Sequence, residues 1–200
     1  KISQGGIFMG IEKHIEQQLM AFVPKYIEML GNSTIIYTYS GGKLKIDKSI
    51  RTYLKSLAKY FMVDLKESKK YYGKLLGMSN MLPIPFDQNN IFIPVKTRVP
   101  MCKNDGAFGY INIDYIEKVE ETKGQVIIHL KSDWKIKSVS TMKTIDKHIA
   151  YGNIVKRLYK ERQTSLPKVI DFYYEYEQPA TKGDIALLRE EIIKIKETLN

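Results

Sequence analysis

The hydrophobic pattern of this chain changes its period at one place, the segment Leu82-Pro83-Ile84-Pro85-Phe86. Each proline pushes the residue before it out of the helical region of backbone space, so this segment is expected to be extended. Ahead of it, apolar residues mostly recur every three or four positions, as in amphipathic helices. Beyond it, short alternating runs separated by turn residues indicate strands. The pattern predicts an α+β fold with a small mixed or antiparallel sheet, flanking helices, and a further helix at each end.

The first part of the chain predicts three helices and one hairpin. The helices are expected at about Gly10–Val23, ended by Pro24; from a cap at Asp47 or Ser49 through Phe61; and at about Asp64–Leu76, ended by Gly77. Two short strands, Tyr26–Leu30 and Thr34–Ser40, flank the turn residues Gly31-Asn32.

The second part predicts strands and a long helix. The strands are expected at Ile91–Val95, Tyr110–Ile116, Gln125–Lys131 and Trp134–Val139, the last two joined by the turn Ser132-Asp133. Glu117, Glu120 and Glu121 are interpreted as a solvated acidic turn. A helix should start near Ser140 or Thr141 and run past Leu158, with a break at Gly152-Asn153.

The C-terminal segment carries a short heptad pattern. Its apolar residues are spaced by 3, 4, 3 and 4 positions: Ile185, Leu188, Ile192, Ile195 and Leu199. This stripe predicts a weak coiled coil that joins copies of the chain, or else a helix docked on its own domain. The expected organisation is an N-terminal extension helix (1–24), a DNA-binding domain (25–162) and a tail with the heptad helix (163–200).

The net charge is +10 at a sequence pI near 9.4, which favours polyanionic partners. Nucleic acid is the first candidate, an anionic membrane surface the second, and a merely solvated lysine surface remains the alternative. One cysteine, Cys102, allows no disulfide within the chain and fits a reducing cytosol. No apolar run is long enough for a membrane span, and no signal peptide is expected, so the predicted location is cytoplasmic.

Two helices and one loop carry the candidate DNA-binding residues. They are Lys48, Arg51, Lys55 and Lys59 on the second predicted helix, Lys66, Lys69, Lys70 and Lys74 on the third, and Lys96, Arg98 and Lys103 in the loop after the strand Ile91–Val95. Lysines on such faces would neutralise phosphates without sequence preference, although they would also serve as a solubilising face. Arg98 is the best candidate for insertion into a DNA groove, the alternative being a pair with a carboxylate.

Several blocks resemble the competence transcription factor (ComK) family. The blocks are Leu82-Pro83-Ile84-Pro85 followed by Ile91-Phe92-Ile93-Pro94, then Cys102-Lys103-Asn104-Asp105, then Gly109-Tyr110-Ile111-Asn112, and upstream Asp47-Lys48-Ser49-Ile50 leading into Leu57-Ala58-Lys59-Tyr60-Phe61. The resemblance covers about 35–162, with Tyr110-Ile111 where the family usually has Trp-Ile. It implies an oligomeric activator that binds AT-rich promoter DNA and works with the transcription machinery. The strands from Tyr110 to Val139 also look somewhat like LytTR-type DNA-binding domains.

Enzyme readings are weak. The three histidines, His14, His129 and His148, lack metal-type spacing, and no phosphate-binding glycine motif is present. We therefore expect no catalysis, metal or cofactor. The aromatic run Phe172–Tyr176 would stack bases or, more commonly, form a buried edge or subunit contact. The alternative function is an interaction or adaptor protein that works through its terminal helices without binding DNA.

Overall fold

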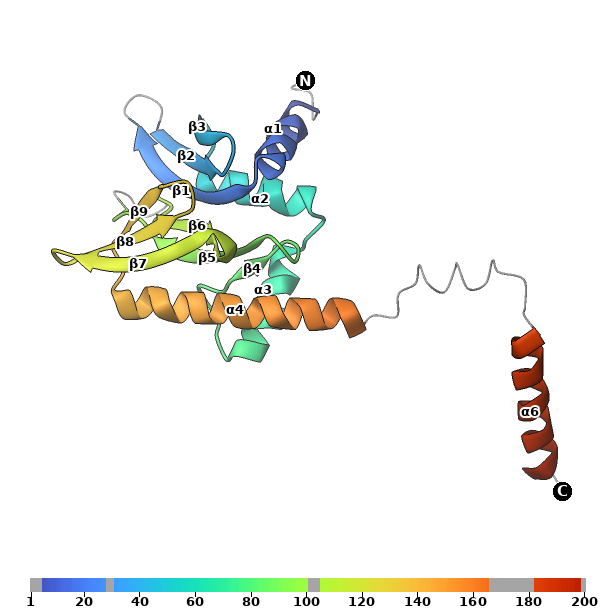
Figure 1. Ribbon diagram of the computed structural model, residues 1–200. Helices are drawn as coiled ribbons and strands as arrows, with labels where there is room; N and C mark the ends of the chain where they lie inside the picture. Colours follow the sequence, from blue (N-terminus) through green and yellow to red (C-terminus); the bar gives the residue numbers. More distant parts are fainter. Residues whose placement is uncertain (1–4, 28–30, 101–104, 166–181, 199–200) are drawn as a thin grey trace. The chain divides into compact units, whose positions relative to one another are not determined.

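The computed structural model describes residues 5–27, 31–100, 105–165 and 182–198 (Figure 1). By its internal contacts the chain forms two units, Lys1–Lys160 and Glu161–Asn200. The segment expected as an N-terminal extension thus belongs to the first unit, and the heptad helix to the second. The aromatic run Phe172–Tyr176 lies outside the described residues.

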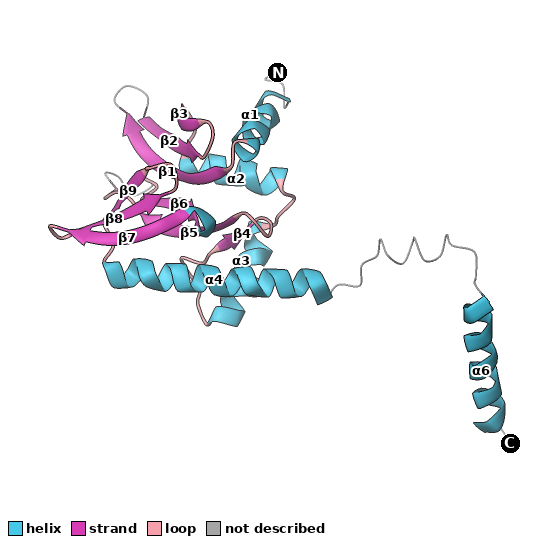
Figure 2. Ribbon diagram, viewed as in Figure 1, coloured by secondary structure: helices cyan, strands magenta, loops and turns pink. Residues whose placement is uncertain are grey.

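The first unit is built on two antiparallel sheets (Figure 2). The larger has the order β3-β2-β1-β6-β5-β4 and the smaller the order β7-β8-β9. The strands are β1 (Leu19–Ile27), β2 (Gly31–Thr38), β3 (Gly42–Ile46), β4 (Ile84–Pro85), β5 (Ile91–Lys96), β6 (Phe108–Asn112), β7 (Ile116–Thr122), β8 (Gln125–Leu130) and β9 (Lys135–Ser138). Together with the helices, these sheets confirm the predicted α+β fold.

The helices are α1 (Gly5–Glu16), α2 (Ile50–Tyr60), α3 (Leu65–Leu76), α4 (Met142–Ser165) and α6 (Lys182–Thr198), with a 3-10 turn η1 at Ile113–Tyr115. Local chemistry fixes the ends of α2 and α3 as the sequence predicted. Ser49 Oγ accepts from the Thr52 N–H, and Asp64 Oδ1 accepts from the N–H groups of Lys66 and Glu67. Gly77, at φ 63°, ends α3 in the left-handed conformation.

The larger sheet separates two parts of the core. One face, through Phe22, Ile36 and Phe92, packs on α1 and α2. The other face, through residues such as Met20, Ile93 and Ile111, packs on the small sheet and on Ile145 of α4. A smaller cluster, Tyr72 with Ile91 and Val155, joins α3 to β5 and α4. Both faces of the larger sheet are therefore covered. The side of α2 that does not pack on the sheet faces solvent.

The predicted helix Gly10–Val23 is wrong over its second half. The helix α1 ends at Glu16, Gln18 takes a φ of 60°, and Leu19–Val23 form the buried start of β1. A strand covered on both faces has a continuous apolar run instead of alternation, which is why this segment resembled a helix. Pro24 lies within β1, beyond Ala21 and Phe22, the β1 residues that pair with β6.

Two further expectations are corrected. The acidic residues Glu117, Glu120 and Glu121 lie in β7, which pairs with β8, rather than in a turn. The helix α4 continues through Gly152-Asn153 without a break. Gly152 is buried, and a Cβ there would lie 2.7 Å from methyl groups of both Ile93 and Ile113. This glycine is a site of close helix–sheet approach.

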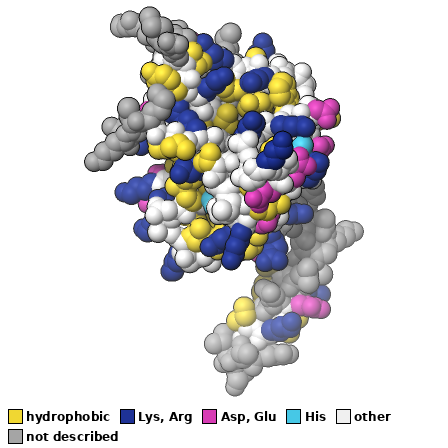
Figure 3. Space-filling model, turned by 90° about the vertical axis from the view of Figure 1, so that its left-hand side faces the viewer, with side chains coloured by type: hydrophobic (Ala, Val, Ile, Leu, Met, Phe, Trp, Pro, Cys, Tyr) yellow, Lys and Arg dark blue, Asp and Glu magenta, His cyan; other side chains and the backbone are white. Residues whose placement is uncertain are grey.

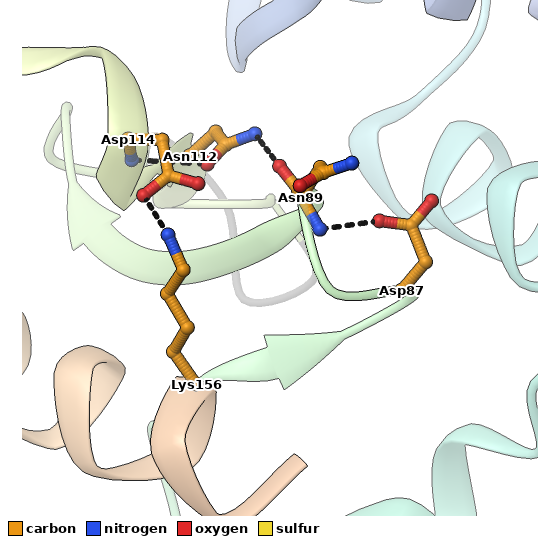
Figure 4. Close-up of polar contacts among 5 residues, drawn as sticks. All are labelled: Asp87, Asn89, Asn112, Asp114 and Lys156. Carbon is orange, nitrogen blue, oxygen red and sulfur yellow. Dashed lines mark hydrogen bonds and ion pairs between the residues drawn. The ribbon is translucent and has the colours of Figure 1, made fainter. Parts of the chain in front are cut away.

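A chain of polar contacts links α4 to η1 and to the segment before β5 (Figure 4). Lys156 of α4 forms an ion pair with Asp114 of η1. The Asp114 N–H donates to Asn112 Oδ1, and Asn112 Nδ2 donates to the Asn89 carbonyl over 2.8 Å. The Asn89 N–H in turn donates to Asp87. Asn112 is completely buried, and a buried amide needs hydrogen-bond partners. Its partners are the Asp114 N–H and the Asn89 carbonyl, two backbone groups from separate segments.

Candidate nucleic-acid interface

The helix α2 presents a basic face to solvent. Its buried side consists of Ile50, Tyr53, Leu57 and Ala58. Arg51, Lys55 and Lys59 are exposed on the remaining surface at four-residue spacing, and half-buried Lys48 precedes the helix. Four-residue spacing places side chains one above another on a helix, so these cations form a continuous row, which we call the α2 row.

Two of the five arginines in the chain meet beside the start of this row. Arg51 of α2 and Arg98 of the segment after β5 both line a cavity of about 480 Å³. We call it the arginine pocket. Its walls come from β1 and β2, the start of α2, the segment after β5 and the entry to β6: Pro24, Asn32, Ser33, Ser49, Ile50, Arg51, Leu54, Arg98, Asp105, Gly106, Ala107, Phe108 and Tyr110.

Arg98 is held by neutral groups instead of extending into solvent. Its Nε donates to the Gly106 carbonyl and its Nη2 to Asn32 Oδ1, both over 2.7 Å. Asn32 Nδ2 donates in turn to Asp105 Oδ1 over 2.8 Å. The third nitrogen, Nη1, is buried and has no hydrogen-bond partner. Arg98 is half-buried. These hydrogen bonds connect its guanidinium to the Asp105 carboxylate indirectly, through the Asn32 side chain.

Close packing brings the Arg98 segment against α2. A Cβ on Gly106 would lie 2.5 Å from Cγ2 of Ile50, the first residue of the helix, so only glycine fits there without a shift. Tyr110 of β6 forms another wall and stacks on Phe22 at 5.1 Å between ring centroids. Burial raises the pKa of Tyr110, and the charge of Arg51 acts in the opposite direction. The positive charge of Arg51 is therefore near enough to the Tyr110 hydroxyl to affect its pKa.

The basic residues of α3 occupy a different place. This helix packs through Tyr72 on Ile91 and Val155, next to β4, whereas α2 packs on β1 and β2. Lys66, Lys69, Lys70 and Lys74 are exposed. Lys70 lies 3.9 Å from Glu67, and Lys69 donates to Asn80. The basic residues of α2 and α3, which the sequence grouped together, therefore lie on helices that contact different strands of the larger sheet.

Other predicted residues have varied positions. The backbone carbonyl of Lys96 accepts from Ser138 Oγ and from the Val139 N–H, which ties β5 to the small sheet, and its side chain is half-buried. Lys103 and Leu199 lie outside the described residues. On α6, Ile185, Leu188, Ile192 and Ile195 are 61, 61, 53 and 57% exposed. The heptad stripe is thus a solvent-facing surface of the second unit.

Basic side chains are also spread beyond the α2 row. Figure 3 shows one face of the molecule with Lys and Arg side chains distributed over it, apolar patches between them and fewer Asp and Glu. Some lysines outside the α2 row have contacts of their own: Lys118 forms an ion pair with Glu120, and Lys131 lies over the Tyr115 ring. What distinguishes the α2 row is its arrangement next to a cavity with two arginines.

The three histidines pack against, or bond to, neighbouring side chains of the fold. His14 of α1, 7% exposed, lies 3.1 Å from the Tyr53 hydroxyl, and burial together with Lys13 and Lys48 lowers its pKa. Burial also lowers the pKa of His148. His129 Nε2 lies 2.7 Å from Glu120 Oε1. Within the described residues, no three His, Cys, Asp or Glu side chains are grouped so that they could hold a metal ion.

Sequence reasoning missed the neutral part of the pocket, namely Asn32, Ser33 and Gly106. Asn32 is 66 and 73 positions from its partners Arg98 and Asp105, and all three residues lack charge, so no local pattern marks them. Comparisons with family models, with curated proteins and with solved structures find no match. The resemblance to the ComK family stays a prediction. None of the helices in the described part of the chain is both long and apolar enough to cross a membrane.

Proposed function

We propose that this protein is a transcription regulator that binds AT-rich promoter DNA through the α2 row and the rim of the arginine pocket. The observation that carries the proposal is the convergence of Arg51 and Arg98, from separate segments, beside a row of lysines on one exposed helix face. The positive net charge of +10 supports a polyanionic partner.

The dimensions of the α2 row suit a phosphate backbone. Arg51 and Lys59 are eight residues apart, which corresponds to about 12 Å along a helix. Duplex DNA carries one negative charge per roughly 1.7 Å of its axis, so a row of this length faces several phosphates. The N-terminus of α2, with its positive dipole end, lies at the same end as Arg51 and adds to the attraction.

The two arginines have different roles in this proposal. Arg51 is exposed and would contact DNA directly, whereas Arg98 is bonded to Gly106 and Asn32 and would shape the surface beside it. The preference for AT-rich DNA follows from the resemblance to the ComK family and from the attraction of arginine to narrow, strongly negative minor grooves. That resemblance also supports activation of transcription in the cytoplasm, as an oligomer that contacts the transcription machinery.

The test is fluorescence anisotropy with labelled AT-rich and GC-rich duplexes of equal length at about 50 and about 200 mM salt. We expect tighter binding to the AT-rich duplex and a steep loss of affinity at the higher salt. Undetectable binding at low salt, or affinity that does not respond to salt, would refute the proposal.

A second candidate is an interaction or adaptor function of α6. Its heptad stripe, with Ile185, Leu188, Ile192 and Ile195 more than half exposed, favours association with another helix. Light scattering of the full chain and of a chain lacking residues 181–200 tests this. If the deletion lowers the oligomeric state while DNA binding survives at high protein concentration, α6 is an assembly element. If the full chain binds a protein partner but no DNA, the adaptor function replaces the first proposal.

A further inference from the structure

We infer that α6 pairs with the α6 helix of a second copy of this chain as a parallel coiled coil in register. This pairing deepens the second candidate function, on which it rests, by naming the partner of α6 and its orientation. The second unit alone carries the pairing, so DNA binding by the first unit is not required for it.

The apolar stripe on α6 sets the heptad register. Ile185 and Ile192 take position a, and Leu188 and Ile195 take position d. These four side chains are between 53 and 61% exposed, whereas positions a and d are buried where two helices pair. Two heptads form a short seam, so we expect a weak pair that dissociates on dilution.

The positions that flank this seam separate the charges of α6 by sign. Position e is basic throughout, and position g is acidic or neutral: Lys182, Arg189 and Lys196 lie at e, and Asp184, Glu191 and Thr198 lie at g. In a coiled coil, residues at e and g lie next to the partner helix, and their charges set the choice of partner and its orientation. The separation by sign therefore distinguishes one orientation of the pair from the other.

A parallel pair matches these charges. In register, position g of one helix lies beside position e of the following heptad of its partner, five positions further along the chain. Asp184 would lie beside Arg189 of the second copy, and Glu191 beside Lys196 of the second copy. Both contacts join opposite charges, and the twofold symmetry of a dimer forms each of them twice.

An antiparallel pair would oppose like charges. In that orientation position e faces e of the partner and g faces g, so basic residues meet basic residues and acidic residues meet acidic ones. Such contacts disfavour a wrong partner or orientation. A partner surface of one sign would likewise repel one flank of α6, whereas a second copy in parallel orientation attracts both flanks.

The parallel orientation also determines where the first units attach. Both chains would enter the pair at the same end, because Lys182 begins α6 in each copy. An antiparallel pair would separate these two points by the length of the 17-residue helix, about 25 Å. If the first units bind DNA as proposed, a parallel pair suits two neighbouring half-sites on one duplex.

Disulfide trapping in the full chain tests the orientation. Cys102, the single cysteine, is replaced by serine, and a new cysteine is placed in the seam as Ile185→Cys or Ile195→Cys. The two variants are oxidised separately and as an equal mixture in a glutathione redox buffer. A parallel pair in register links each variant to itself. An antiparallel pair, in which a faces d of the partner, forms disulfides only in the mixture. Glu190→Cys, at the exposed position f, measures the background from random collisions.

Charge reversal tests the reason for the orientation. Glu191→Lys would place two lysines side by side in the pair, and Lys196→Glu would place two carboxylates there. We expect either change to weaken dimerisation about tenfold in sedimentation equilibrium at about 50 mM salt. The double variant Glu191→Lys/Lys196→Glu restores opposite charges and should recover the wild-type affinity. The control Glu190→Lys makes the same change of net charge at an exposed position f and should alter the dissociation constant by less than about threefold.

Dimers trapped in each single variant above the Glu190→Cys background, together with recovery in the double charge variant, support the parallel pair. Dimers trapped only in the mixture overturn the parallel orientation but leave association through α6 standing. No trapping above background in any reaction overturns both the pair and the second candidate function. Equal effects of Glu191→Lys and Glu190→Lys on dimerisation overturn the assignment of orientation to the flanking charges. The salt-dependent DNA affinity of the wild type decides the first proposal separately from all of these results.

Discussion

Replacing Gly152 by alanine tests how closely α4 lies on the larger sheet. In an isolated helix, this change would stabilise by about 1 kcal/mol, since glycine is a poor helix former. Here the new methyl group would lie 2.7 Å from Cγ2 of Ile93 and 2.7 Å from Cγ2 of Ile113. Ile93 is completely buried, and these methyl groups branch directly from Cβ, so neither moves without a change of rotamer or backbone.

Overpacking of this kind typically costs about 1–3 kcal/mol, and two simultaneous close contacts place Gly152→Ala in the upper part of that range. After subtracting the helix-propensity gain, we expect a net loss of about 1–2 kcal/mol in the free energy of unfolding. Urea unfolding followed by circular dichroism should show a lower midpoint with an unchanged slope.

The neighbouring Asn153 provides the matched control. It is exposed on the same turn of α4, so Asn153→Ala should gain a few tenths of a kcal/mol, at most about 0.7, from helix propensity alone. If Gly152→Ala also stabilised the protein, the packing of α4 on Ile93 and Ile113 would be refuted.

Two further predictions concern stability. Because burial lowers the pKa of His14 and His148 in the folded protein, the unfolded chain binds more protons below its ordinary histidine pKa of about 6.5. The free energy of unfolding from urea titrations should therefore fall as the pH decreases from 7.5 to 5.5, by at most about 1.4 kcal/mol per pH unit for each histidine, and a flat profile in both wild type and His14→Gln would contradict this. For the half-exposed ion pair of Lys156 with Asp114, a double-mutant cycle using Lys156→Met and Asp114→Asn should give a coupling free energy below about 1 kcal/mol, and a larger value would mean that the pair anchors α4.

The sequence predicted the features whose causes are local. Ser49, Asp64 and Gly77 act on backbone groups within a few residues, so the ends of α2 and α3 followed from residue type alone. The start of β1 was missed because α1 and α2 cover it on one face and the small sheet covers it on the other, and a run of apolar residues does not report which elements cover it.

In the candidate site, too, the features with local causes were predictable and those that depend on the tertiary fold were not. The α2 row was predictable because four-residue spacing on one helix determines which side chains share a face. The arginine pocket was not, since it requires Asn32, Arg51 and Arg98 to meet from separate segments, and only the strand order of the larger sheet brings these segments together. The sequence singled out Arg98 as the best candidate for insertion into a DNA groove, and its bonds to Gly106 and Asn32 could not be predicted because they depend on that same topology.

The salt dependence of DNA affinity in a chain without the α2 row is the most direct test of the central claim. In this variant Lys48, Arg51, Lys55 and Lys59 are all replaced by glutamine, and a control carries the same four-charge loss at Lys123, Lys131, Lys135 and Lys137. Affinity falls as salt rises, so the slope of log affinity against log salt is negative. If the α2 row contacts phosphates, the magnitude of this slope should be smaller by about 3–4 in the row variant and should change much less in the control. Equal slopes for the two variants, both correctly folded, would contradict the claim that this helix face binds DNA.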